Sequence, residues 1–270
     1  AILETGLGGQ FDSVTACKPS LQLFTSISYD HMHILGNTLE QITTEKAKAI
    51  QPYTPCISVN HSNPIKKILN SFAKQNRTSI LYNTDTIDSL PPTTLLGEHQ
   101  KENINLAIKA AQHLIDINMH NIISGIKNIY WPGRNQIISN NPTIIFDVAH
   151  NESSLIEFIH SMKLLNIKGN KTLLISIQKT KKINQAIPYL ENYFDEIICT
   201  RLNNRMYNSK NLCTIFSNNT HTIAENNPSD TIQKTIKILH KDDLLAIVGS
   251  HYWGPIIQKS FKNSFVSQFR

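Results

Sequence analysis

The feature that most constrains the fold is a regular alternation of strand-like and helix-like segments in the second half of the chain. Apolar, β-prone runs end at polar turns, and amphipathic helical patterns fill the intervals. Short connections between alternating strands and helices are typical of a mostly parallel sheet covered by helices. We therefore predict an α/β fold with a Rossmann-like layout here. The predicted strands are 143–146, 172–177, 196–199 and 244–248, and the predicted helices are 153–165, 183–193 and 230–239.

The first half is less regular. Residues 3–9 are predicted to be the end of a strand that runs into a glycine-rich turn, and residues 21–27 a second strand. Thr38 and Gln41 have the spacing of a capping box and predict a helix start. A further helix is predicted over 102–117, and the turn-rich stretch 130–134 is interpreted as a hinge. We predict two domains, residues 1–125 and residues 126–270.

Composition narrows the classes of function. No apolar run approaches the roughly 20 residues that a membrane helix needs. The four cysteines are far apart and form no CxxC pair, which argues against a zinc site or a disulfide framework and favours a reducing, cytoplasmic location. The net charge of +6 is compatible with nucleic-acid binding, but the lysines are spread along the chain. We expect a monomer with no nucleic-acid or membrane partner.

Two strand ends carry residues that could share a divalent ion. Glu4 stands beside three glycines at the end of the first predicted strand, and His31 follows Asp30 at the end of the second. Ligands collect at the carboxyl ends of strands in α/β sheets, and carboxylate and imidazole both bind divalent metals. An ordinary tight turn and a structural histidine remain the alternatives.

Lys46 falls on an apolar helix face. Leu39, Ile42, Lys46 and Ala49 recur at spacings of three and four residues. A desolvated lysine loses its charge more easily, and a neutral amine can take up carbon dioxide to become a carbamate, an anion suited to a metal site. A lysine that extends its amine to solvent near the helix end is the alternative.

Asp147 and Arg134 are candidates for nucleotide contacts. Asp147 directly follows the strand 143–146, where acidic residues in nucleotide sites bind ribose hydroxyls. Arg134 follows Pro132-Gly133 and could face a phosphate across the hinge, or lie on the surface. Asn151 is a natural N-cap for the next helix.

Taken in order, several segments resemble the folylpolyglutamate synthase/dihydrofolate synthase family, a branch of the Mur ligase superfamily. VGSHYWG (248–254) is a weaker match than the others. The matching segments are ETGLGGQFDS (4–13), TSISYDHMHILGNTLEQITTEKA (25–47), LLGEHQKEN (95–103), WPGR (131–134) and FDVAHN (146–151).

The resemblance implies a metal and substrate site in the first domain. Glu4 and His31 match the family's magnesium ligands, and Lys46 matches its carbamylated lysine. The segment that meets the pterin substrate corresponds to Phe11, Asp12 and Ser13.

The resemblance also implies a nucleotide site. Asn103 matches a contact to the base of ATP, Arg134 a contact to the phosphates, and Asp147 a contact to the ribose. His150 lies beside that site and is expected to contribute to catalysis.

The fold implied by the family is the C-terminal part of a P-loop ATPase domain followed by a Rossmann-like Mur ligase C-terminal domain. The implied activity is an ATP-dependent ligase with Mg²⁺, joining L-glutamate to dihydropteroate, to a reduced folate, or to both, through an acyl phosphate. The chain begins with Ala1 and contains no Gly-Lys-Ser or Gly-Lys-Thr sequence. We therefore expect a fragment that lacks the phosphate-binding loop and is inactive alone.

Several positions depart from the family's pattern. Gln10 replaces an arginine after the glycines, Val14-Thr15 replaces Thr-Asn, and Lys48 replaces a glycine. The later Asp-Lys-Asp motif reads Thr180-Lys181-Lys182. A Mur-type ligase acting on a cell-wall precursor is one alternative interpretation. A catalytically dead homologue that still binds nucleotide is the other.

Overall fold

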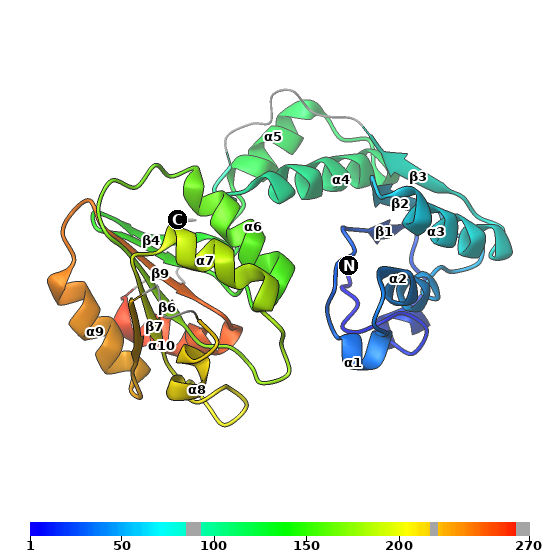
Figure 1. Cartoon of the computed structure of the whole chain (residues 1–270). Coiled ribbons are helices and arrows are strands. Elements are labelled where there is room, and N and C mark those ends of the chain that lie inside the picture. Colours follow the sequence, from blue (N-terminus) through cyan, green and yellow to red (C-terminus); the bar gives the residue numbers. More distant parts are fainter. Residues whose placement is uncertain (85–92, 217–220, 263–270) are drawn as a thin grey trace. The chain divides into compact units, whose positions relative to one another are not determined.

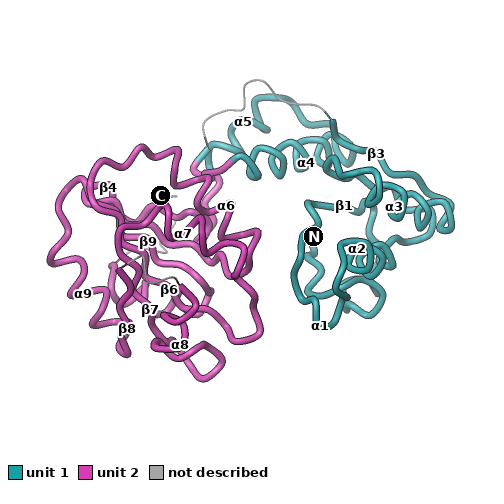
Figure 2. Tube along the Cα trace, viewed as in Figure 1, with its two compact units in different colours: residues 1–93, 98–128 teal, residues 94–97, 129–270 magenta. Residues whose placement is uncertain are grey.

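The computed structural model describes residues 1–84, 93–216 and 221–262 (Figure 1). The chain forms two compact units. The first contains residues 1–93 and 98–128, and the second contains residues 94–97 and 129–270 (Figure 2). In the described part of the chain, no helix is both long and apolar enough to span a bilayer.

The first unit is built on a three-stranded parallel sheet in the order β1-β2-β3. Helices α2 and α3 bury one face of this sheet, where Ala47 and Leu69 pack against Cys56. Leu106 of α4 covers Ile57 on the other face. The elements are η1 (Ser13–Ala16), β1 (Gln22–Phe24), α1 (Met32–Leu35), α2 (Leu39–Ala47), β2 (Cys56–Val59), α3 (Asn63–Gln75), β3 (Ile80–Asn83), α4 (Glu98–Leu114) and α5 (Met119–Lys127).

The second unit contains a six-stranded sheet in the order β4-β5-β9-β6-β7-β8, in which only the β4–β5 pair is antiparallel. The carboxyl ends of β5, β9, β6, β7 and β8 therefore meet at one edge of the sheet. The elements are β4 (Gln136–Asn140), β5 (Thr143–Phe146), α6 (Glu152–Lys163), β6 (Lys171–Ile175), η2 (Asn184–Ala186), α7 (Ile187–Tyr193), β7 (Glu196–Cys199), α8 (Ser209–Cys213), β8 (His221–Ala224), α9 (Pro228–Ile238), β9 (Leu244–Val248), η3 (His251–Trp253) and α10 (Gly254–Ser260).

Helices cover both faces of the larger sheet, and successive strand residues point to opposite faces, so that both sets of side chains are buried. Ile145 and Leu173 face α6, α7 and α8, and Figure 1 shows α6 and α7 side by side. The neighbouring residues Ile144 and Leu174 face α9 and α10, where Trp253 is fully buried. The near-continuous apolar strands of this half of the sequence follow from this double burial.

The α/β class predicted from the sequence is confirmed, and three strands of the second half have the predicted bounds: β5, β7 and β9. The capping box at Thr38 and Gln41 is also confirmed, with Thr38 Oγ1 accepting from Gln41 N at 3.2 Å and Gln41 Oε1 accepting from Thr38 N at 3.2 Å. The assignment of residues 1–125 to an ATPase domain and of 126–270 to a separate domain stays a prediction.

Several predictions for the first half are wrong in detail. Residues 1–6 form no strand, and the second strand covers only Gln22–Phe24 of the predicted 21–27. The predicted helix 102–117 is observed as α4, which begins at Glu98 and ends at Leu114, and Ile115 beyond its end is exposed. Apolar residues keep a helical spacing in the sequence beyond Leu114, although the backbone is no longer helical there.

Candidate functional site

Asp147, at the carboxyl end of β5, is buried, with 7% of its surface exposed. Asn135 N donates to its Oδ2 at 2.6 Å, and Ala149 N donates to its Oδ1 at 2.7 Å. The carboxylate therefore holds together the loop before β4 and the loop after β5. The predicted contact of Asp147 with a ribose stays a prediction.

Gly133 explains why these loops lie so close together. Val148 N donates to Gly133 O at 3.0 Å, and an added Cβ on Gly133 would lie 2.8 Å from Val148 Cγ1. The φ of Gly133 is also positive, at 72°. The next residue, Arg134, is exposed, and its Nη1 donates to Gly133 O at 3.4 Å. The turn thus presents a guanidinium at the surface beside the Asp147 loop.

His150 and Asn151 begin helix α6. Asn151 Oδ1 accepts from Ser154 N at 2.9 Å and Ser154 Oγ accepts from Asn151 N at 3.1 Å, which confirms the predicted cap. The Nδ1 of half-buried His150 lies 2.8 Å from Val148 O. A carbonyl only accepts hydrogen bonds, so the Nδ1 of His150 is the donor in this contact.

Asn103 lies on α4 of the first unit, whereas Arg134 and Asp147 lie in the second. Asn103 is half-buried, and its Nδ2 donates to Gln100 Oε1 at 3.4 Å. The predicted convergence of these three residues on one nucleotide stays a prediction.

In the first unit, Asp12 organises the glycine-rich turn. Its Oδ2 accepts from Gly6 N and Leu7 N, each at 2.9 Å, and its Oδ1 accepts from Val14 N at 2.9 Å. The backbone hydrogen bond from Leu7, followed by that from Val14, lowers the pKa of Asp12. The geometry gives Asp12 a positioning role, whatever its contact with substrate.

The neighbours of Asp12 are open to solvent. Phe11 is 91% exposed, and Ser13, the first residue of η1, is also exposed. A large apolar side chain held at the surface of an ordered turn is available to a flat aromatic ligand. The predicted pterin contact of this segment stays a prediction.

Gly9 brings the turn against the end of α2. An added Cβ on Gly9 would lie 2.5 Å from Glu45 O and 2.9 Å from Lys46 O. Gly8, with φ 68°, likewise packs near Leu35 of α1. The turn that follows Glu4 and the backbone of Lys46 are therefore neighbours, and the Lys46 side chain is half-buried.

The candidate metal ligands are less tightly defined. Glu4 is exposed, and His31 begins α1 with a positive φ of 49°. The His31 Nε2 lies 3.9 Å from Asp30 Oδ2, and the His31 ring centroid lies 6.2 Å from that of His33. The described residues contain no cluster of three or more His, Cys, Asp and Glu side chains able to hold a metal. The convergence of Glu4, His31 and Lys46 stays a prediction.

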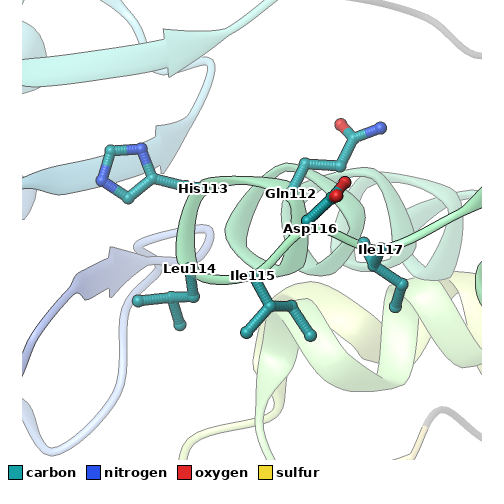
Figure 3. Close-up of a pocket in the computed structure, with 6 residues that line it drawn as sticks. All are labelled: Gln112, His113, Leu114, Ile115, Asp116 and Ile117. Carbon is teal, nitrogen blue, oxygen red and sulfur yellow. The ribbon is translucent and has the colours of Figure 1, made fainter.

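A hollow elsewhere in the first unit contains none of these residues. Six consecutive residues at the end of α4, 112–117, line it (Figure 3). Their side chains fan out around the helix end, and Leu114 and Ile115 are exposed. An open surface of this kind provides no converging polar groups for chemistry.

Sequence reasoning missed Asn135, which is buried in the second unit. It adopts a positive φ of 46°, and its Nδ2 donates to Leu96 O at 2.9 Å. Asparagine tolerates this conformation better than most residues, and its position after a Pro-Gly turn was the available signal.

Ser176 and Thr200 are two further buried residues that the sequence did not single out. They directly follow β6 and β7, and their hydroxyls have no hydrogen-bond partner within the described structure. No pattern in the sequence distinguishes such hydroxyls from ordinary turn residues.

Residues 133–251 match the family described as Mur ligase, glutamate ligase domain. The chain is also 28% identical over 289 residues to the dihydrofolate synthase/folylpolyglutamate synthase of Bacillus subtilis, covering 97% of this chain and 67% of that protein. A folylpolyglutamate synthase of Candida albicans is 30% identical, covering 87% of this chain and 52% of the relative.

Solved structures show the same fold. The E. coli FolC structure in complex with ADP, without folate substrate, superposes with a TM-score of 0.85 at 22% identity, covering 94% of this chain and 65% of that one. A Mycobacterium tuberculosis folylpolyglutamate synthase complexed with ADP gives a TM-score of 0.84 at 19% identity, covering 96% and 67%. The chain thus spans about half to two thirds of the length of these relatives.

Proposed function

We propose that the complete protein is an ATP-dependent glutamate ligase. The premise is that this chain belongs to the folylpolyglutamate synthase/dihydrofolate synthase family. Its acceptor is dihydropteroate, a reduced folate, or both. The observation that carries the proposal is the similarity to a dihydrofolate synthase/folylpolyglutamate synthase over 97% of this chain. The match of residues 133–251 to a glutamate ligase domain supports the identity of the added amino acid.

The reaction proceeds in two steps. An oxygen of the acceptor's carboxylate attacks the γ-phosphorus of ATP, ADP leaves, and an acyl phosphate forms. The α-amino nitrogen of L-glutamate then attacks the acyl carbon, phosphate leaves, and the amine gives up its protons. His150 is the candidate to take a proton, because imidazole is a common general base and His150 lies three residues after Asp147.

Three residues are the candidate contacts of the nucleotide. Arg134 offers an exposed guanidinium suited to a phosphate, and Asp147 stands at a strand end suited to ribose hydroxyls. Asn103 is assigned to the base. Because Asp147 also holds two backbone N–H groups, it positions the Arg134 turn as well as offering its own oxygens.

Magnesium is assigned to Glu4, His31 and the carbamate of Lys46. Magnesium in phosphoryl transfer typically takes one or two protein carboxylates and completes its shell with phosphate oxygens and water, so a small donor set fits it. The bound ion would offset charge on the transferring phosphoryl group. The packing of Gly9 on Lys46 O supports the proximity of the glycine turn to Lys46.

The test is a turnover assay of the complete gene product, including any residues that its coding DNA specifies beyond 1–270. We expect phosphate release that requires both L-glutamate and either dihydropteroate or tetrahydrofolate. Turnover with a UDP-linked cell-wall precursor and none with a pteroate would instead support a Mur-type ligase. Residues 1–270 alone are expected to be inactive, since they contain no Gly-Lys-Ser or Gly-Lys-Thr sequence.

A further inference from the structure

The chain enters the second unit twice, and its first visit is only four residues long. Residues 94–97 belong to the second unit, although residues 1–93 before them and 98–128 after them belong to the first (Figure 2). Helix α4, which carries Asn103, begins directly after these four residues, at Glu98. Residues 94–97, here called the link segment, therefore lead from the second unit into α4.

Two side-chain hydrogen bonds hold the link segment. Thr94 Oγ1 donates to Ile129 O, and Asn135 Nδ2 donates to Leu96 O at 2.9 Å. Gly97, the last residue of the link segment, has a φ of 112°, a conformation that favours glycine. The link segment is thus fixed near both ends to the stretch of chain that runs from α5 into β4.

Asn135 holds a second partner as well. Its backbone N–H donates to Asp147 Oδ2 at 2.6 Å, while its side chain reaches Leu96, thirty-nine residues earlier in the sequence. A carbonyl such as Leu96 O only accepts hydrogen bonds, so the amide of Asn135 must turn its nitrogen toward Leu96. One residue therefore joins the link segment to the carboxylate at the end of β5.

The backbone at Asn135 makes this double contact possible. Asn135 has a φ of 46° and Gly133 a φ of 72°, so left-handed residues lie on both sides of exposed Arg134. Asparagine adopts this region more readily than most non-glycine residues. The turn thus directs Arg134 to the surface and Asn135, which is only 3% exposed, to the interior.

A second left-handed asparagine of the chain lacks these features. Asn166 has a φ of 49°, but it is exposed, and its Oδ1 accepts from Lys168 Nζ, two residues away, at 3.1 Å. A left-handed backbone alone therefore requires neither burial nor a long-range hydrogen bond. The burial and the contact with Leu96 are specific to Asn135.

We propose that Asn135 is a positioning residue that couples the Asp147 carboxylate to the link segment. The inference rests on the proposed function, in which Arg134 and Asp147 bind the nucleotide. A nucleotide that orders the Asp147 carboxylate also orders Asn135, and through the Asn135 amide it orders the link segment. The effect is reciprocal, because a fixed link segment in turn holds the N–H of Asn135 in place for Asp147.

The first test is hydrogen–deuterium exchange of the link segment in the 270-residue chain without ligand. Asn135→Gly keeps a backbone suited to positive φ and the N–H for Asp147, and it removes the amide that holds Leu96. Exchange is expected to rise about fivefold, the effect of losing about one hydrogen bond, with no change in β6 and β9. The matched control Asn166→Gly should change it less than about 1.5-fold.

The second test adds ADP to the complete gene product, at a concentration that calorimetry shows to saturate each variant. ADP is expected to slow exchange of the link segment at least about threefold in the unaltered protein and in Asn166→Gly, but less than about 1.5-fold in Asn135→Gly. Asn135→Asp replaces the donor by an acceptor opposite Leu96 O and should behave as Asn135→Gly does. A purely structural role would leave the protection by ADP intact in every variant.

Three outcomes overturn the proposal. The first is unchanged exchange of the link segment in Asn135→Gly without ligand. The second is equal protection by ADP in Asn135→Gly and in the unaltered protein, and the third is an unaltered protein whose link segment ADP does not protect. Neither test uses L-glutamate or a pteroate, so failure of the ligase reaction and failure of this coupling are distinguished.

Discussion

The backbone N–H of Asn135 donates to Asp147 Oδ2 at 2.6 Å, across twelve residues of sequence. Ala149 N donates to the other oxygen of this carboxylate, Oδ1, at 2.7 Å. Asp147, which the sequence predicts as a nucleotide contact, therefore also joins the loop before β4 to the loop after β5 by hydrogen bonds. Changes at Asp147 act on both binding and structure, and the experiments need to separate the two.

Asp147→Ala is expected to lower the free energy of unfolding by about 3 kcal/mol, because two buried backbone donors lose a charged acceptor. Urea unfolding measures this loss. Asp195→Ala is the control, since exposed Asp195 accepts one backbone bond, from Lys171 N at 2.8 Å, and should cost less than about 1 kcal/mol. If Asp147→Ala loses no more free energy of unfolding than Asp195→Ala, the Asp147 carboxylate does not hold the two loops together.

In the complete enzyme, Asp147→Ala should also weaken ATP use far more than folate binding.

Gly249→Ala is expected to destabilise the second unit by about 3 kcal/mol or more. An added Cβ would lie 2.1 Å from Ser176 O, and the φ of Gly249 is 111°. Gly254→Ala is the matched control five residues downstream, at the start of α10, where an added Cβ meets nothing within 4 Å. It should be neutral or stabilise by about 0.5 kcal/mol. Thermal unfolding compares the melting temperatures of the two variants. Similar values would contradict the close approach of Gly249, after β9, to Ser176, after β6.

Gly9→Ala is expected to push the glycine turn away from α2, at a cost of about 2 kcal/mol, because the added Cβ meets backbone atoms of Glu45, Lys46 and Ala49. Hydrogen exchange at the end of α2 should rise. Gly125→Ala, at an exposed and unobstructed position of α5, should instead stabilise by about 0.5–1 kcal/mol. An unchanged exchange rate in Gly9→Ala would mean that the turn is not packed on α2.

Asp12 predicts a pH dependence of the glycine turn. Its folded pKa is lowered from the ordinary value of 3.8, first by the hydrogen bond from Leu7 N. The stabilisation is therefore fully present above the ordinary pKa and is lost as the pH falls through the lowered pKa. NMR should show the Gly6 and Leu7 amide shifts moving over that acidic range. Asp12→Asn should abolish the transition, and a transition that survives it would assign the titration to another group.

The fold of the second half was predictable because its signal is local. Strands buried on both faces read as apolar runs, as in Leu244–Val248, and side-chain caps such as Asn151 mark helix starts within a few residues. Short edge strands carry no such signal. Strand β8, His221–Ala224, is only partly buried and was missed for that reason.

The sequence named candidate site residues, whose roles stay predictions, and it did not indicate their contacts. The resemblance pointed to Asp147 and Lys46, but nothing in the local sequence indicated that Asn135 would donate to Asp147 or that Gly9 would pack on Lys46 O. Such pairings depend on how separate loops meet at the sheet edge.

In the proposed reaction, ATP activates a carboxylate before glutamate attacks it. The most direct measurement uses the complete gene product with dihydropteroate labelled with ¹⁸O in its carboxylate, together with ATP and L-glutamate. The account predicts that each phosphate released carries one ¹⁸O atom, because the acyl phosphate passes a carboxylate oxygen to phosphate when the amide forms. Glutamate-dependent amide formation with no ¹⁸O in the phosphate would contradict the account.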